Sequence, residues 1–288
     1  NARGEWVVPP TLDNARGFSD DGFARFNAGG RWGYVNLAGQ TVIAPQFADA
    51  NAMRNGLAGV RTGTNQWRII DASGQFTCEA KFFRIMGFAE NGLACAVGYN
   101  ATRQKRFGFV DRTGEWKIEP RFHRPADFGD HDVAAATDDD KKFGVIDTRG
   151  EWVLEPAYAC INNFNADGFA YYYLENSYDW DNPPGYLNLR GEPVVRGNKH
   201  LSERMVCGIA MNSHDGRAYI RSDNTELPTP PICYGTQFRK AGRLALVLLS
   251  ERTSEAAAEP DRTRWGLLHD DGTFVRAPAE LLEPLTDE

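Results

Sequence analysis

The chain has 288 residues, 42% of them hydrophobic and 25% charged, with a net charge of −7 and a pI of about 5.4. This composition is ordinary for a folded protein, but the acidic balance argues against nucleic-acid binding, which requires a basic stripe. No cluster of Lys and Arg is larger than a short group such as 103–106. No segment approaches the roughly 18 apolar residues of a membrane-spanning helix, so we expect no membrane insertion.

A short block recurs along the chain at intervals of about 34 to 47 residues. Its first clear copy is Arg31-Trp32-Gly33-Tyr34-Val35, and most copies join an aromatic residue to glycine and then to apolar residues. Aromatic and β-branched residues in such short runs favour strands. The seven copies define units that start near residues 31, 66, 106, 142, 184, 217 and 264, after a partial N-terminal unit at 4–30.

A turn and a second strand are predicted to follow each first block. In the copy Asp111-Arg112-Thr113-Gly114, aspartate at the first position and glycine at the last suit a tight hairpin turn. Asp71 and Asp147 recur at the same position; we interpret them as turn residues, with an acidic ring for a cation as the alternative. We expect the second strand to end at its proline, for example Pro120, because proline lacks an N–H group.

A third block, such as Gly92-Leu93-Ala94, closes each unit with another short strand. Units of two to four strands cannot bury an apolar face alone, so neighbouring units must stack. We therefore predict one all-β domain over residues 1–288, a repeat array of about seven three- to four-stranded units. A β-propeller-like ring is the favoured arrangement, and an open β-solenoid is the alternative.

These blocks resemble the WG repeat of bacterial proteins, named for a Trp-Gly pair. The resemblance is carried by Trp32-Gly33 and Trp265-Gly266, and by the close variants Phe107-Gly108 and Phe143-Gly144. It is strong over residues 31–175 and weaker over 184–249. The resemblance implies a non-catalytic repeat scaffold, often in envelope or secreted contexts, and provides no catalytic residues. We therefore favour export or the periplasm over the cytoplasm, although no signal peptide is visible.

Recurring aromatic and cysteine residues are interpreted as structural. The tryptophans at repeat positions are expected in the core, with an aromatic ligand platform as the alternative: Trp32, Trp67, Trp116, Trp152 and Trp265. The cysteines lack a C-x-x-C pair, so we expect buried free thiols rather than a zinc site, with one disulfide as the alternative. They are Cys78, Cys95, Cys160, Cys207 and Cys233.

Loops that break the repeat are better candidates for binding, because insertions at one unit position project from one face of a repeat array. Two acidic loops are singled out as a partner-binding site, with Trp180 as an aromatic anchor beside Tyr178. The predicted contact residues are Trp180, Tyr178, Asp179, Asp181, Asp138, Asp139 and Asp140. The acidic side chains favour a protein partner with a basic surface, and Trp180 with Tyr178 also suits stacking on a glycan.

The sequence therefore favours a non-catalytic protein-binding scaffold, of which an immunity or inhibitor protein is one specific version. A carbohydrate or cell-wall binding module is the first alternative, and a hydrolase with a site at the centre of a ring is the second. No nucleophile motif, phosphate loop or paired histidine ligands occur, so we expect no enzyme activity, no cofactor and no metal.

Overall fold

The computed structural model describes residues 14–139, 141–174, 184–196, 201–206, 208–212, 218–227, 232–235, 244–250 and 263–276. The chain divides into two compact units, unit 1 (Asn1–Ala157) and unit 2 (Tyr158–Glu288). In the described part, each sheet has three or four strands that neighbour one another in chain order, which confirms the predicted all-β repeat fold. Across the same residues, no helix is long and apolar enough to cross a membrane.

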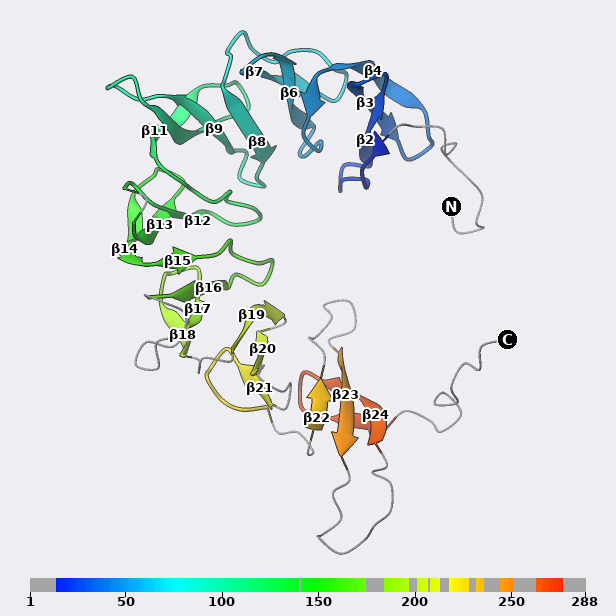
Figure 1. Cartoon of the computed structure of the whole chain (residues 1–288), viewed down its shortest axis with the longest axis vertical. Helices are drawn as coiled ribbons and strands as arrows, with labels where there is room; N and C mark the ends of the chain where they lie inside the picture. Colours follow the sequence, from blue (N-terminus) through cyan, green and yellow to red (C-terminus); the bar gives the residue numbers. More distant parts are fainter. Residues whose placement is uncertain are drawn as a thin grey trace, which may run out of the picture. The chain divides into compact units, whose positions relative to one another are not determined.

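Unit 1 contains four sheets that follow one another along the chain (Figure 1). Sheet 1 consists of β1 (Asn14–Ala15), β2 (Phe23–Ala28), β3 (Arg31–Asn36) and β4 (Thr41–Phe47). Sheet 2 consists of β5 (Asp49–Ala50), β6 (Leu57–Gly63) and β7 (Gln66–Asp71). Sheet 3 consists of β8 (Arg84–Phe88), β9 (Ala94–Tyr99), β10 (Lys105–Val110) and β11 (Trp116–Phe122). Sheet 4 consists of β12 (Val133–Ala136), β13 (Phe143–Asp147) and β14 (Trp152–Tyr158).

Unit 2 contains three further sheets of the same kind. Sheet 5 consists of β15 (Cys160–Ile161), β16 (Ala170–Tyr173), β17 (Gly185–Leu187) and β18 (Pro193–Arg196). Sheet 6 consists of β19 (Leu201–Val206), β20 (Ile209–Asn212) and β21 (Ala218–Arg221). Sheet 7 consists of β22 (Ile232–Gly235), β23 (Leu244–Ser250), β24 (Thr263–His269) and β25 (Phe274–Arg276).

The glycine of the first block allows two backbones to approach closely. A Cβ atom at Gly108 would overlap the carbonyl oxygen of Ile118 and lie 2.8 Å from the nitrogen of Pro120. The same close approach recurs at Gly33, where the added atom would lie 2.7 Å from the Pro45 nitrogen. The glycine is therefore required by the neighbouring strand rather than by its own backbone angles.

The prediction that the second strand ends at its proline is wrong. Pro120 lies inside β11, and pairing with β10 continues beyond it to the Phe107–Phe122 pair after a shift in register. β11 is the edge strand of sheet 3, where a missing N–H group and a bulge are tolerated. Proline therefore marks the bulge opposite the repeat glycine, not the end of the strand.

Sheet 2 departs from the repeat where Arg68 replaces the glycine. The segment after β7 makes only isolated bridges, Trp67–Phe82 and Ile70–Phe76, and forms no fourth strand of this sheet. The Arg68 guanidinium lies 3.6 Å from the centre of the Phe76 ring and donates to the Cys78 carbonyl at 2.9 Å. An arginine at this position therefore holds the segment by side-chain contacts in place of strand pairing.

The aspartates at the turn start cap the backbone locally, as predicted. The Oδ1 atom of Asp111 accepts the N–H groups of Thr113 at 2.8 Å and Glu115 at 3.1 Å. Asp71 and Asp147 accept the corresponding pairs of N–H groups in their own turns. These bonds confirm the turn interpretation. Among the described residues, no group of three or more metal-ligating side chains occurs.

A pH-dependent stability is expected from the Asp111 turn. Burial opposes ionisation of Asp111, but hydrogen bonds from Thr113 and Lys117 outweigh it and lower its pKa to about 2. The ionised carboxylate therefore stabilises the fold above the unfolded-state pKa of about 3.9, and this contribution is lost as the pH falls towards 2. Asp111→Asn should keep the turn, since Asn36 caps the equivalent turn of sheet 1.

We therefore expect the wild type to have a higher urea midpoint than Asp111→Asn at pH 7, with the difference closing between about pH 4 and pH 2. Asp138→Asn is the matched control, because Asp138 is exposed and forms no ion pair with the described residues. A difference for Asp111→Asn that stays constant over this pH range would show that the turn, not the charge, is responsible.

Apolar side chains form cores between successive sheets of unit 1. Between sheets 3 and 4, the fully buried Phe109 lies 4.7 Å from Phe128, centroid to centroid, and Phe122 packs beside them. The described repeat tryptophans are buried or half-buried against these cores, which confirms the core interpretation for Trp32, Trp67, Trp116 and Trp152. The side chain of Trp265 lies outside the described part.

Three cysteines fall within the described residues as free thiols, Cys78, Cys95 and Cys160. Cys95 is buried in the core between sheets 3 and 4, and burial raises the pKa of its thiol. Cys78 and Cys160 are only half-buried, so the prediction of buried thiols is confirmed for Cys95 alone among the three. Cys207 and the side chain of Cys233 lie outside the described part.

Polar side chains in the turns before the third-block strands link one sheet of unit 1 to the next. Asp21 accepts the N–H group of Gly56 at 2.8 Å, and the Asn55 amide donates to the Ala89 carbonyl at 3.1 Å. Asn91 then donates to the His131 carbonyl at 3.0 Å. Equivalent turns therefore lie side by side, and we call this side the turn end of unit 1.

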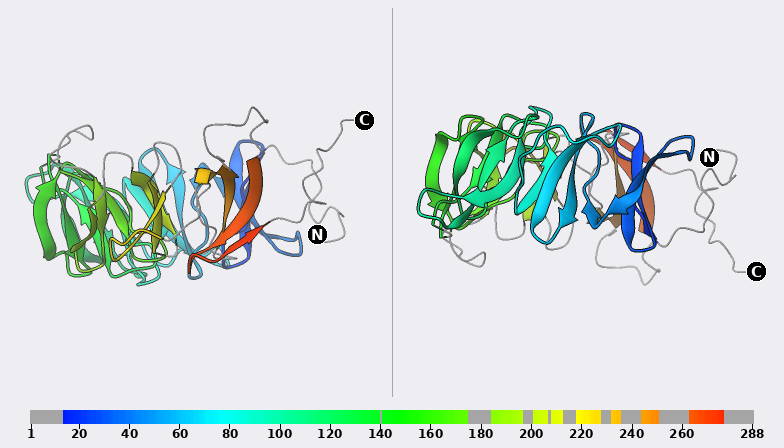
Figure 2. Two further views of the ribbon diagram at one scale, coloured as in Figure 1. Left: turned by 90° about the horizontal axis from the view of Figure 1, so that it is seen from below. Right: turned by 90° about the horizontal axis from the view of Figure 1, so that it is seen from above.

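The hairpins between the third-block strand and the following Trp-Gly strand, such as β9–β10 and β12–β13, lie at the opposite side, which we call the hairpin end. This follows from the strand order, because consecutive turns of a meander alternate between its two ends. Figure 2 shows the strands of the first sheets running between two loop-bearing sides. The hairpins of sheets 3 and 4, near residues 100–104 and 137–142, therefore share one end of unit 1, as predicted for the variable loops.

Candidate functional site

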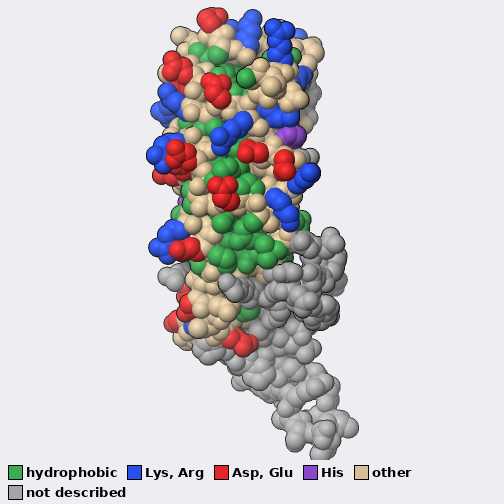
Figure 3. Space-filling model, turned by 90° about the vertical axis from the view of Figure 1, so that its left-hand side faces the viewer, with side chains coloured by type: hydrophobic (Ala, Val, Ile, Leu, Met, Phe, Trp, Pro, Cys, Tyr) green, Lys and Arg blue, Asp and Glu red, His purple; other side chains and the backbone are tan. Residues whose placement is uncertain are grey.

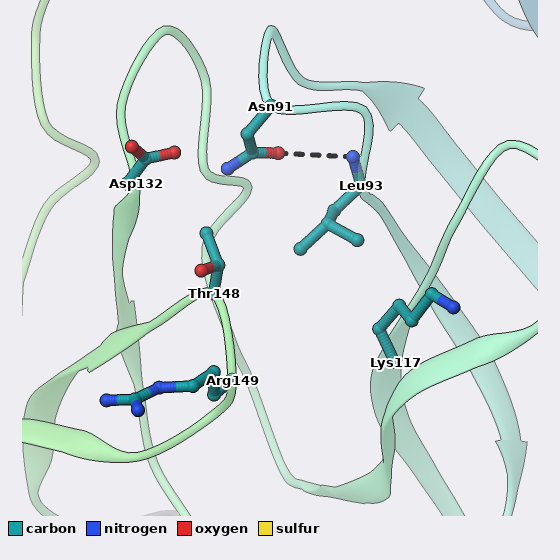
Figure 4. Close-up of a pocket in the computed structure, with 6 residues that line it drawn as sticks. All are labelled: Asn91, Leu93, Lys117, Asp132, Thr148 and Arg149. Atoms are coloured by element: carbon teal, nitrogen blue, oxygen red, sulfur yellow. Dashed lines mark hydrogen bonds between the residues drawn. The ribbon is translucent and has the colours of Figure 1, made fainter.

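A pocket of about 440 Å³ opens at the turn end, between sheets 3 and 4. Its walls come from four places: the β8–β9 turn, strand β11, the segment before β12 and the segment after β13. In Figure 4 the Asp132 carboxylate and the Asn91 amide point towards each other, while the Lys117 and Arg149 side chains lie on opposite sides. The lining residues are Asn91, Leu93, Lys117, Asp132, Thr148 and Arg149.

At the pocket, sheet 4 has a threonine where sheet 3 has an arginine that lies across the preceding junction. In sheet 3, the Arg112 side chain passes over Gly92, and its Nη2 atom donates to the Asn55 carbonyl of sheet 2 at 2.8 Å. The strand registers place Thr148 of sheet 4 at the position of Arg112, and Asp132 at the position of Gly92. The short threonine leaves open the space that the arginine covers one junction earlier.

Two polar side chains of the pocket, Asn91 and Asp132, differ in whether other residues already bind them. Asn91 is held on both sides, because its Oδ1 atom accepts the Leu93 N–H group at 3.1 Å while its amide donates to His131. The Asp132 carboxylate, by contrast, forms no ion pair with any described residue. The pocket therefore combines a fixed amide, an uncompensated carboxylate and the apolar Leu93 side chain.

The cations at the rim are already paired with carboxylates of their own turns. Lys117 lies 3.0 Å from Asp111 and 3.6 Å from Glu115. Arg149 lies 2.9 Å from the carboxylate of Asp147 and 2.8 Å from that of Glu151, both in its own turn. With Asp132 added, carboxylates outnumber cations around the opening, so the pocket favours a positively charged group.

The predicted acidic contacts lie elsewhere. Asp138 and Asp139 are exposed on the β12–β13 hairpin, at the hairpin end and so on the opposite side from the pocket. The Lys141 N–H group donates to Asp139 at 3.0 Å, and this bond lowers the pKa of the Asp139 carboxyl. The remaining predicted contacts lie outside the described residues: Asp140, Tyr178, Asp179, Trp180 and Asp181.

Sequence reasoning missed all six pocket residues. A signal was present, because the turns Asp111-Arg112-Thr113-Gly114 and Asp147-Thr148-Arg149-Gly150 exchange the order of arginine and threonine. The glycine that precedes the third-block strand is also absent before Val133. Both differences from the repeat lie at the junction between sheets 3 and 4, but only the packing of these two sheets shows that they are neighbours.

The face drawn in Figure 3 carries mixed charges rather than a field of one sign. The face shown in Figure 3 intersperses acidic and basic side chains with apolar groups. Among the described residues, basic groups of the turns pair with neighbouring carboxylates, such as Arg190 with Glu192 at 2.9 Å in unit 2. A local excess of one charge, as at the pocket, therefore stands out against its surroundings.

The fold and its junctions define an all-β repeat protein built from three- to four-stranded sheets. A family model described as the WG containing repeat matches residues 1–32, 32–63, 107–141 and 143–178, a little under half of the chain. Over these residues the match confirms the resemblance to the WG-repeat family that the sequence predicted. No significant match to a curated protein was found.

Solved structures with similar folds share little sequence with the chain. A eukaryotic initiation factor is 10% identical, with 88% of this chain and 84% of that chain covered and a TM-score of 0.46. BamB from Moraxella catarrhalis is 11% identical, with 93% and 90% covered and a TM-score of 0.39. The WD40 β-propeller domain of Doa1 is 12% identical, with 74% and 76% covered and a TM-score of 0.35. At these scores, none of the three bears on function.

Proposed function

We propose that the protein is a non-catalytic scaffold that binds a protein partner and receives a basic side chain of that partner in the pocket at the turn end. The supporting observation is the uncompensated Asp132 carboxylate in an opening where carboxylates outnumber cations. A partner lysine or arginine would pair with Asp132, because a carboxylate without a cation gains a charge-assisted hydrogen bond. This agrees with the basic partner surface predicted from the sequence.

The dimensions and walls of the pocket suit one long side chain. Its volume of about 440 Å³ lies at the lower end of the range for binding pockets, about 300–1,000 Å³. The Leu93 side chain offers an apolar wall for the methylene groups of lysine or arginine, whose charged ends extend past such walls. The rigid cores on both sides keep the opening formed before binding, which lowers the entropic cost of association.

An immunity or inhibitor role is a narrower version of the same proposal, in which the partner is a toxin or enzyme with a basic surface. Carbohydrate binding is a second candidate function. It is supported by the amide of Asn91, the carboxylate of Asp132 and the hydroxyl of Thr148, which together surround the apolar Leu93 side chain. Such groups would bond sugar hydroxyls while the apolar wall contacts the ring.

Closing the pocket should abolish partner binding without unfolding the protein. In Thr148→Arg, the new side chain would cover the pocket as Arg112 covers the preceding junction. We expect Thr148→Arg to lose a partner that the wild type captures from a lysate of the source organism, and Asp132→Asn to bind it about tenfold more weakly. After capture, the purified partner is titrated into the wild type and each variant, and calorimetry measures the affinities.

The control is Thr64→Arg, which makes the same substitution at an exposed position of the β6–β7 hairpin, at the hairpin end. It should bind the partner as the wild type does. Equal binding by Thr148→Arg and the wild type would refute the pocket as a contact. If the wild type bound an oligosaccharide but no protein, and Thr148→Arg lost the oligosaccharide, carbohydrate binding would replace the proposal.

A further inference from the structure

The β9–β10 hairpin of sheet 3 has a rigid tip. The Asn100 side chain accepts the N–H groups of Thr102 at 3.1 Å and Gln104 at 2.8 Å, and the Thr102 hydroxyl at 2.9 Å. The backbone N–H group of Arg103 also donates to the Asn100 carbonyl at 3.0 Å. Residues 99–105 are therefore presented in one conformation, with little flexibility to lose on binding.

Two aromatic rings and a lysine form one cluster at the base of this hairpin. The Phe83 and Tyr99 rings meet edge to face at 4.9 Å, and the Lys105 ammonium lies 4.1 Å from the centre of the Phe83 ring. Tyr99 is nevertheless 56% exposed. An aromatic side chain braced by neighbours but open to solvent has the character of an interface anchor.

Positive charge on the hairpin lacks carboxylate partners. Arg103, Lys105 and Arg106 form no ion pair with any residue that the structure describes, in contrast to Lys117 and Arg149 at the turn end. The Arg106 guanidinium is fixed by bonds of 2.9 Å to the Lys105 carbonyl and to the Gln104 side chain. Three cations within four residues are thus concentrated on one tip of a protein with a net charge of −7.

We propose that the β9–β10 hairpin is a docking site for a short acidic segment of a protein, with an apolar side chain of that segment against Tyr99. Charge complementarity selects acidic residues, and the exposed ring selects an apolar neighbour among them. A nucleic acid fits less well, because its phosphate charges continue along the strand, whereas the basic tip spans only residues 103–106.

This site is separate from the pocket and has the opposite charge preference. The pocket lies at the turn end and favours a cation, whereas the hairpin lies at the hairpin end and favours an anion. The inference does not rest on the proposed function, and each of the two sites stands or falls with its own variant.

The test uses fluorescence polarisation with a short labelled peptide of alternating glutamate and leucine, titrated with the full chain. We expect the wild type to bind this peptide, with affinity that falls as salt is raised, and to bind a glutamine-for-glutamate peptide at least about fivefold more weakly. Lys105→Glu should weaken binding of the glutamate peptide about fivefold or more, and Tyr99→Ser should also weaken it.

The matched control is Lys141→Glu, which makes the same charge change on the neighbouring hairpin and should leave binding within about twofold of wild type. Equal losses for Lys105→Glu and Lys141→Glu would overturn the proposal, because they would reflect net charge alone. Equal binding of both peptides, or preference for a single-stranded oligothymidylate, would overturn it as well. Thr148→Arg should bind the glutamate peptide as the wild type does. Peptide binding at the hairpin is therefore tested independently of partner binding at the pocket.

Discussion

Gly108→Ala is expected to lower the free energy of unfolding by about 3 kcal/mol or more. The added methyl group would overlap the Ile118 carbonyl oxygen and press against the Pro120 nitrogen, both of them backbone atoms that cannot rotate away. β11 would have to separate from β10 or shift along it, which would expose the apolar side chains beneath. Urea denaturation followed by tryptophan fluorescence measures the loss.

Gly17→Ala is the control for this substitution. A Cβ atom at Gly17 has no neighbour within 4 Å, and its backbone is not in the left-handed region. The free energy of unfolding of Gly17→Ala should therefore stay within about 0.5 kcal/mol of the wild-type value. If Gly108→Ala were equally harmless, the close approach of the two strands would not be the reason for glycine in the Trp-Gly pair.

Phe109→Ala, one position further along the same strand, should destabilise unit 1 by about 3–5 kcal/mol. The Phe109 side chain is fully buried between sheets 3 and 4, where it packs against Phe128. Its removal leaves a cavity at the junction that joins two repeats. The urea midpoint should fall, and hydrogen exchange should accelerate in β10 and β13 before it does in β3 of sheet 1.

Phe18→Ala removes the same ring from a position that is 47% exposed and serves as the matched control. It should change stability by no more than about 0.5 kcal/mol. A large loss for Phe18→Ala, or a small one for Phe109→Ala, would contradict the view that the junction between sheets holds unit 1 together.

Local features were predictable from the sequence, because the groups that form them lie a few residues apart. The Asp111 turn is an example: its carboxylate bonds to N–H groups two and four residues ahead. The alternation of the Trp-Gly strands and their turns follows from the same short-range pattern, so the all-β repeat fold could be predicted without knowledge of any contact between units.

Features that depend on contacts between strands or sheets were not predictable. Pro120 was expected to end its strand, but the bulge opposite Gly108 lets pairing resume after it. The pocket depends on Thr148 lying at the position that Arg112 fills one sheet earlier, and Arg112 makes its bond to a residue 57 positions away. A single sequence shows both residues but not the junction that they share.

Arg112, at the second position of its turn, covers the junction behind it, whereas Thr148 at the same position of sheet 4 is too short to do so. Arg112 closes its junction by a hydrogen bond at the surface, while the phenylalanine cores that join the sheets lie beneath and are untouched. Substitution of this one surface residue would therefore open or close a pocket without disturbing the buried core. Because the fold repeats this junction, a pocket could form between other pairs of sheets as well. A single substitution could therefore change which junction binds a partner without altering the fold.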